Sequence, residues 1–232
     1  MTRAAPSNAT SDPMQRLQRR LIWLTVYAVA MAYLESAVVV YLRDIYYPDG
    51  FAFPLAPIEP GMFAIEIGRE VATLVMLLGV AMVISEDRWE RFLFFCLSFG
   101  VWDIFYYVWL RVFLDWPSSL LTWDILFLIP VPWIGPVLAP IIVSVALIIG
   151  SLLLFRLKRQ GVRLVFPPWV WGLAVTGGGL VLLSFTLDFR AVLAQIDPPP
   201  FRWWLFALGV TCGVVALARG VSSLARGTTN ER

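Results

Sequence analysis

Several charged side chains lie within apolar stretches of the sequence, where an ionised group is costly. Four are acidic and two are basic: Glu35, Glu66, Arg69, Glu70, Asp103 and Arg111. In membrane-spanning segments such residues face the protein interior and mark ion paths, binding sites or paired helix contacts. These six residues are therefore the first candidates for any chemistry that the chain performs.

Helical spacing places some of these side chains on shared faces. Glu66 and Glu70 are one helical turn apart with Arg69 beside them, and Asp103 and Tyr107 repeat the same spacing. With a rise of 1.5 Å per residue, the four acids fall in the outer half of their spans, down to the midplane. We therefore predict one site that is reached from outside. Its predicted residues are Glu35, Glu66, Arg69, Glu70, Asp103, Tyr107, Arg111 and Asp124, the last at the outer border.

Acidic groups outnumber basic groups in these spans. Four carboxyl groups face two guanidinium groups, which leaves two negative charges without a basic partner. Either a carboxyl group is protonated at neutral pH, or a cation or cationic substrate group fills the site. A purely structural reading stays open, because polar contacts between membrane helices stabilise packing by about 0.6–2 kcal/mol each.

The absence of histidine from the sequence excludes several kinds of site. Histidine-ligated haem, histidine-based zinc and the usual histidine general base all require it. Cys96 and Cys212 lie in apolar runs without C-x-x-C spacing, and neither a G-x-S-x-G nor a P-loop pattern occurs. We expect no cofactor and no nucleic-acid partner, while a carboxylate-only site for a hard cation such as Mg²⁺ stays open.

The elements that position these residues are apolar segments long enough to cross a bilayer. Apolar residues make up 59% of the 232 residues and charged residues 15%, against about a quarter charged in soluble domains. The expected spans are 21–42, 61–84, 92–114, 125–155, 168–187 and 201–218. The predicted fold is therefore an all-α polytopic bundle.

Proline interrupts the fourth predicted span, at Pro130, Pro132, Pro136 and Pro140. Prolines at this density prevent a straight helix. We expect a short broken or re-entrant piece, followed by a membrane-spanning helix from about Ile134 to Phe155. Irregular backbone at that depth requires cover from protein or from a water-filled cavity.

Basic residues predict the orientation of the spans. If the N-terminus is cytoplasmic, 13 of the 18 Lys and Arg residues lie in cytoplasmic segments, and both termini are inside. We expect a disordered cytoplasmic tail at 1–15, a core of four spans at 16–155, two more spans at 156–220 and a tail at 221–232. A cleaved signal peptide is the alternative for the first span, because "RLQRR" precedes an apolar run that ends in "AVAMA".

The runs "FGVWDIFYYVWL" and "WPSSLLTWDILFLIPVPWIGPVLAP" resemble a recurring pattern in uncharacterised bacterial integral membrane proteins. The resemblance covers about residues 99–140, and the upstream segments "YLESAVVVYLRD" and "EIGRE" are similar too. It implies a multi-pass protein of the bacterial inner membrane. It implies no activity.

Three functions are compatible with these observations. The first is an outward-facing site that binds or transports a cation, a proton or a polar lipid head group. The second is a lipid-modifying enzyme within the membrane, with Asp103 or Glu66 as general acid or base. The third is a non-catalytic subunit of a membrane complex. Expected partners are membrane lipid, a small cation or lipid substrate, and another membrane protein or a second copy of the chain.

Overall fold

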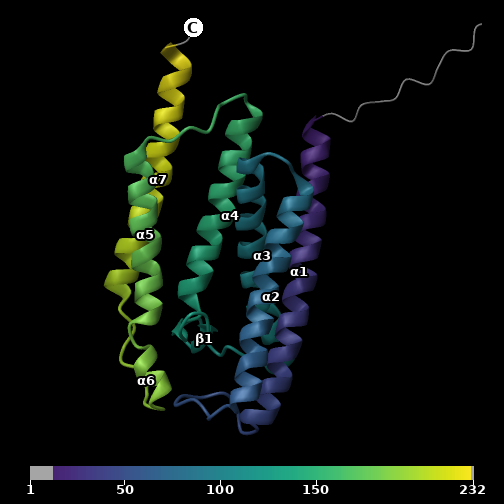
Figure 1. The fold of residues 1–232 in the computed structure, drawn as a ribbon, viewed down its shortest axis with the longest axis vertical. Coiled ribbons are helices and arrows are strands. Elements are labelled where there is room, and N and C mark those ends of the chain that lie inside the picture. Colours follow the sequence, from purple (N-terminus) through teal and green to yellow (C-terminus); the bar gives the residue numbers. More distant parts are fainter. Residues whose placement is uncertain (1–12, 231–232) are drawn as a thin grey trace, which may run out of the picture.

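The computed structural model describes residues 13–230, which form six long helices, one short helix and a two-stranded hairpin (Figure 1). The long helices are α1 (Pro13–Tyr46), α2 (Pro60–Ile84), α3 (Arg88–Leu114), α4 (Leu138–Arg159), α5 (Pro168–Thr186) and α7 (Trp203–Asn230). The remaining elements are α6 (Phe189–Leu193), β1 (Trp123–Phe127) and β2 (Trp133–Pro136). Most of the predicted tail at 1–15 lies outside the described residues, and the segment from 221 to Asn230 continues α7 as helix.

Six of the described helical segments are long and apolar enough to cross a membrane. The predicted number of spans is thereby confirmed, and the chain has the character of a multi-pass membrane protein. Large apolar side chains such as Val83, Trp204 and Val175 are exposed along these helices. Such a surface suits contact with lipid rather than with water.

Residue types at the helix ends explain where the helices begin. Pro60 and Pro168 occupy first-turn positions, where the missing N–H has no intrahelical partner to lose. At the start of α3, the side chain of Asp87 accepts a hydrogen bond of 2.9 Å from the backbone N–H of Glu90. Helix α3 ends at Leu114, and the next residue, Asp115, adopts a left-handed backbone conformation.

The first part of the fourth predicted span, which the sequence predicts to be a short broken or re-entrant piece before a helix from about Ile134, is a two-stranded hairpin, so the fold is not all-α at this element. Residues 123–136 form an antiparallel hairpin in which Trp123 pairs with Pro136, and α4 begins only at Leu138. Proline lacks an N–H, so Pro130 and Pro132 cannot sustain a helical ladder there. Pairing between the two strands satisfies backbone groups that a broken helix would leave unpaired.

Helix α3 is central to the packing of the first four spans, since it contacts α1, α2 and α4. Helices α5 and α7 pack on each other as a pair at one side of this core (Figure 1). A Cβ atom added at Gly177 would lie 2.7 Å from the carbonyl oxygen of Gly209. Glycine is required at this crossing because the two backbones approach too closely for a side chain.

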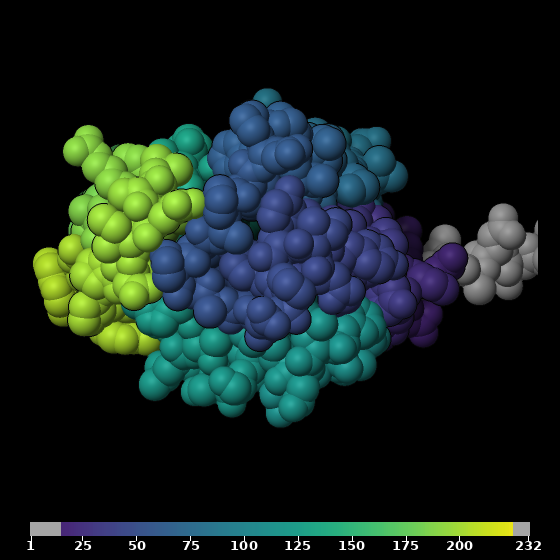
Figure 2. Space-filling model, turned by 90° about the horizontal axis from the view of Figure 1, so that it is seen from below, coloured from purple at the N-terminus to yellow at the C-terminus, as the bar shows by residue number. Residues whose placement is uncertain are grey.

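The connections divide between the two ends of the bundle. Residues 47–59, 115–122 and 187–202 lie at one end, and the short turns between α2 and α3 and between α4 and α5 lie at the other (Figure 1). We call the first the loop end. Viewed from the loop end, the last turns of α1 and the segment after it lie across the centre of the molecule (Figure 2).

Candidate functional site

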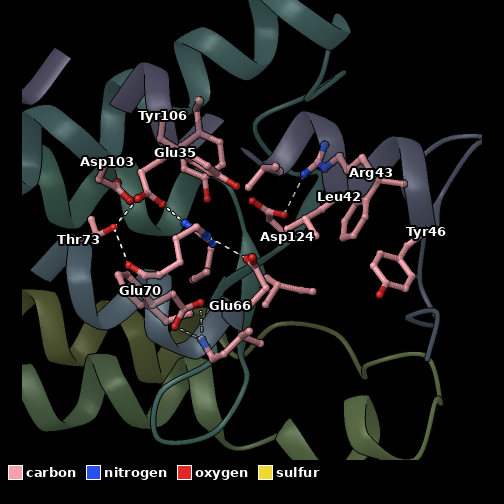
Figure 3. Close-up of a pocket in the computed structure, with 18 of the residues that line it drawn as sticks. Glu35, Leu42, Arg43, Tyr46, Glu66, Glu70, Thr73, Asp103, Tyr106 and Asp124 are labelled. Carbon is pink, nitrogen blue, oxygen red and sulfur yellow. Dashed lines mark hydrogen bonds and ion pairs between the residues drawn. The ribbon is translucent and has the colours of Figure 1, made fainter. Parts of the chain in front are cut away.

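A cavity of about 130 Å³ lies near the loop end, between α1, α2, α3 and the β1 strand (Figure 3). A volume of that order accommodates several water molecules or one small organic molecule. The polar residues that line it include Glu35, Arg43, Glu66, Arg69, Glu70, Thr73, Trp102, Asp103, Tyr106, Tyr107 and Asp124. We call these residues the polar cluster.

Arg69 is the basic centre of one half of the polar cluster. Its Nε donates a hydrogen bond of 2.9 Å to Glu66 on the same helix, and its Nη1 forms an ion pair with Glu35 on α1. The hydroxyl of Thr73 donates a hydrogen bond to the other oxygen of Glu35. A single guanidinium therefore neutralises one of two carboxylates and joins α1 to α2.

Glu70 and Asp103 are held by hydrogen bonds instead of ion pairs. The backbone N–H of Leu128, just after β1, donates to both carboxylate oxygens of Glu70, at 3.0 and 2.8 Å. The hydroxyl of Ser144 on α4 donates to Asp103 at 2.8 Å. Within residues 13–230 neither acid forms an ion pair, although both are buried.

Arg43 and Asp124 form a second ion pair, with 3.3 Å between Nη2 and Oδ1. Aromatic rings enclose the arginine, whose Cζ lies 3.7 Å from the ring centre of Trp116 and 4.5 Å from that of Phe51. Asp124 is only 2% exposed, and burial raises its pKa to about 6, an effect that the charge of Arg43 partly opposes. The carboxyl group is thus expected to lose its proton near neutral pH.

Three buried polar atoms on the cavity wall lack a hydrogen-bond partner among the described residues. They are Oδ2 of Asp124, Nη1 of Arg43 and Nε1 of Trp102. Buried polar groups are almost always hydrogen-bonded, and each exception requires an explanation. All three line one cavity, where a bound donor would satisfy Oδ2 of Asp124 and a bound acceptor, such as water, would satisfy the N–H groups of Arg43 and Trp102.

The structure brings together seven of the eight residues that the sequence predicts for the site. Arg111 is the exception, because it does not line the cavity. Arg111 instead points toward the end of α3, where its Nη2 lies 3.0 Å from the carboxylate of Asp115. It is about half exposed, because its long side chain reaches the polar end of the helix.

Arg43 is a charged residue of the cavity that the sequence analysis did not predict for the site. The first span was expected to end at Leu42, which placed Arg43 in an outer loop, but α1 continues to Tyr46. Arg43 lies eight residues after Glu35, with Val39 midway, and all three line the cavity. That spacing of two helical turns is the signal by which the sequence could have found it.

The charge balance of the polar cluster is more negative than the sequence indicates. Exchanging Arg111 for Arg43 leaves two guanidinium groups, while Asp124 raises the number of carboxyl groups to five. With every carboxyl group ionised, the polar cluster therefore carries three more negative charges than positive charges. In a low-dielectric setting such an excess requires protons or a bound cation.

No family model matches the chain, and comparisons with curated proteins and with solved structures found no match either. Among the described residues, no group of three or more His, Cys, Asp or Glu side chains is arranged to hold a metal ion. The geometry of the cavity is therefore the basis for assigning a function.

Proposed function

We propose that this chain is an integral membrane protein whose cavity binds, or passes across the membrane, a ligand with a positively charged group. The observation that carries the proposal is the excess of three buried carboxyl groups around a cavity, together with the unpartnered Oδ2 of Asp124. A cation in the cavity compensates this charge and supplies the absent partner.

Glu70 and Asp103 are the acids best placed to receive the charge. Each lines the cavity and has hydrogen-bond donors but no ion pair among the described residues. Glu35, Glu66 and Asp124 already face guanidinium groups. An arriving cation therefore gains most by approaching Glu70 and Asp103.

The proposed orientation places the cavity on the outer side of a bacterial inner membrane. Basic residues such as Arg20, Lys158 and Arg159 lie at the end opposite the loop end. Cytoplasmic segments carry the excess of Lys and Arg in membrane proteins. The loop end, and the cavity with it, then faces outward.

A lipid-modifying enzyme is less well supported by the geometry. Ser144 is the candidate nucleophile, because its hydroxyl lies 2.8 Å from the carboxylate of Asp103. It is 1% exposed and does not line the cavity, so a substrate in the cavity does not reach its hydroxyl. A nucleophile has to contact the atom that it attacks.

Thermal unfolding in lipid nanodiscs tests the proposal, with methylammonium chloride as the probe at constant ionic strength. A ligand that binds only the folded protein raises the unfolding midpoint in a saturable way. We expect this rise for wild type and for Glu59→Gln, an exposed glutamate outside the cavity. We expect Glu70→Gln and Asp103→Asn to reduce or remove it.

Two outcomes contradict the proposal. One is the absence of a saturable rise for wild type. The other is an equal rise in the cavity variants and in Glu59→Gln, which would mean that methylammonium acts elsewhere on the protein. Two separate cavity variants are used so that poor folding of one leaves the comparison intact.

A further inference from the structure

We infer that the ligand is a small monoamine with an apolar body next to its charge. This inference rests on the proposed function, since it specifies the cation that the cavity takes. It distinguishes an alkylammonium-like ligand from a bare inorganic cation, from a polyamine and from a phospholipid head group.

The cavity has an acidic side and a side on which apolar side chains lie. Glu35, Glu66, Glu70 and Asp103 lie on one side of Asp124, while Leu42, Tyr46 and Arg43, which is paired with Asp124, lie on the other (Figure 3). Further apolar lining comes from the first helix, the loop before the second helix and the hairpin: Val39, Ile58, Ile125, Leu126, Phe127 and Leu128.

The arrangement of acidic and apolar side chains determines which kind of cation the cavity can bind favourably. A bare cation uses only the acidic side and leaves apolar side chains facing water, which is unfavourable by about 25 cal/mol per Å² of exposed apolar surface. Among the described residues, no three acidic side chains are arranged so that they could hold a bare metal cation. A ligand with an ammonium group and a short hydrocarbon body uses both sides of the cavity.

The same lining disfavours the other cations. The second charge of a diamine would lie among apolar side chains and near the guanidinium group of Arg43, where it is desolvated and repelled. The phosphate of a zwitterionic lipid head group would meet five carboxyl groups and only two guanidinium groups, both of which already face carboxylates. The aromatic residues Trp102, Tyr106 and Tyr107 line the cavity, and an organic ammonium group interacts favourably with the face of an aromatic ring.

A homologous series of probes measures the apolar contribution. Binding of methyl-, ethyl-, propyl- and butylammonium to the protein in nanodiscs is followed by intrinsic tryptophan fluorescence, since Trp102 lines the cavity. Each methylene that enters an apolar environment tightens binding by about fourfold. We expect this gradient until the cavity is filled. We expect butane-1,4-diamine to bind no more tightly than methylammonium.

Neutral probes and a matched pair of variants locate the effect. Butan-1-ol carries the same chain without charge, and we expect no saturable signal from it. Val39→Thr keeps the shape of a side chain in the cavity and makes it polar, so it should reduce the gradient. Val75→Thr makes the same change at an exposed position on α2 outside the cavity, and should leave the gradient unchanged.

The outcomes separate the inference from the proposed function. If all four ammonium probes bind with the same affinity, or if the diamine binds much more tightly than butylammonium, the inference is overturned and the cation site remains. If no ammonium probe binds, or if butan-1-ol binds as well as butylammonium, the proposed function itself is overturned.

Discussion

At the scale of single residues, the most informative group is Asp124, because its charge depends on pH near neutrality. Its pKa of about 6 lies above the ordinary value of 3.8, since burial disfavours the carboxylate. The folded protein therefore holds this proton more tightly than the unfolded chain does. Between about pH 4 and pH 6 the folded form is protonated at Asp124, whereas the unfolded form is not.

A pH dependence of cation binding follows from this shift. Below about pH 6 a proton on Asp124 removes one negative charge from the cavity, so the Kd for methylammonium should rise by up to about tenfold per pH unit. Equilibrium binding at pH 5, 6 and 7.5 measures the effect. Asp115→Asn should show the wild-type dependence and Asp124→Asn a weaker one. A Kd that is constant over this range contradicts the role of Asp124.

Arg69 should contribute strongly to stability, because it is the partner of two buried acids. Arg69→Ala leaves Glu35 and Glu66 without a cation, and loss of one member of a buried pair typically costs about 3–5 kcal/mol. Arg111→Ala removes an exposed pair with Asp115, which typically contributes 0–1 kcal/mol. Thermal unfolding in nanodiscs compares the two variants, and similar midpoints would show that the environment of Arg69 is effectively aqueous.

At the scale of elements, the hairpin holds the cavity together. It supplies Asp124 to Arg43 on α1 and the N–H of Leu128 to Glu70 on α2. These contacts join the segment between α3 and α4 to the first two helices. The hairpin is therefore a wall of the site as well as a connection.

Replacement of Leu128 by proline tests the contact with Glu70. Leu128→Pro removes the N–H that donates to both carboxylate oxygens, whereas Leu128→Ala keeps it. Leaving a buried acceptor unsatisfied typically costs about 1–3 kcal/mol, so the proline variant should unfold at a lower temperature than the alanine variant. Equal midpoints for the two variants would mean that the hairpin is held by packing of its side chains alone.

The hairpin also shows where sequence patterns are insufficient. Apolar runs of the right length predicted all six spans, because the bilayer sets their length and composition. The prolines at 130, 132 and 136 indicated a break but not its form. Pairing between β1 and β2 depends on contacts across the turn and with Glu70, which periodicity within one segment does not reveal.

The candidate site was predictable to a similar degree. Charge inside apolar spans identified Glu35, Glu66, Arg69, Glu70 and Asp103, because such residues have to find partners in the protein interior. The sequence analysis predicted Arg111 for the site, whereas the structure places Arg43 in the cavity lining and Arg111 outside it. Each lies near the end of a helix, where a long side chain can turn toward the interior or toward water, and only the surrounding rings decide between the two.

At the scale of the whole molecule, the orientation of the bundle determines which compartment reaches the cavity. The distribution of Lys and Arg predicts that fusions of a compartment-sensitive reporter after Arg91 and after Arg159 report the cytoplasm. Fusions near Asp49 and Ser119 should report the outer side. An outer signal after Arg159 would contradict the proposed orientation and place the loop end in the cytoplasm.

Equilibrium binding of radiolabelled methylammonium to the protein in nanodiscs tests the central claim most directly. The account predicts saturable binding of about one molecule per chain, weakened in Glu70→Gln and unchanged in Glu59→Gln. Binding that does not saturate, or that is the same in both variants, would show that the buried carboxyl groups form an internal network with no cationic ligand.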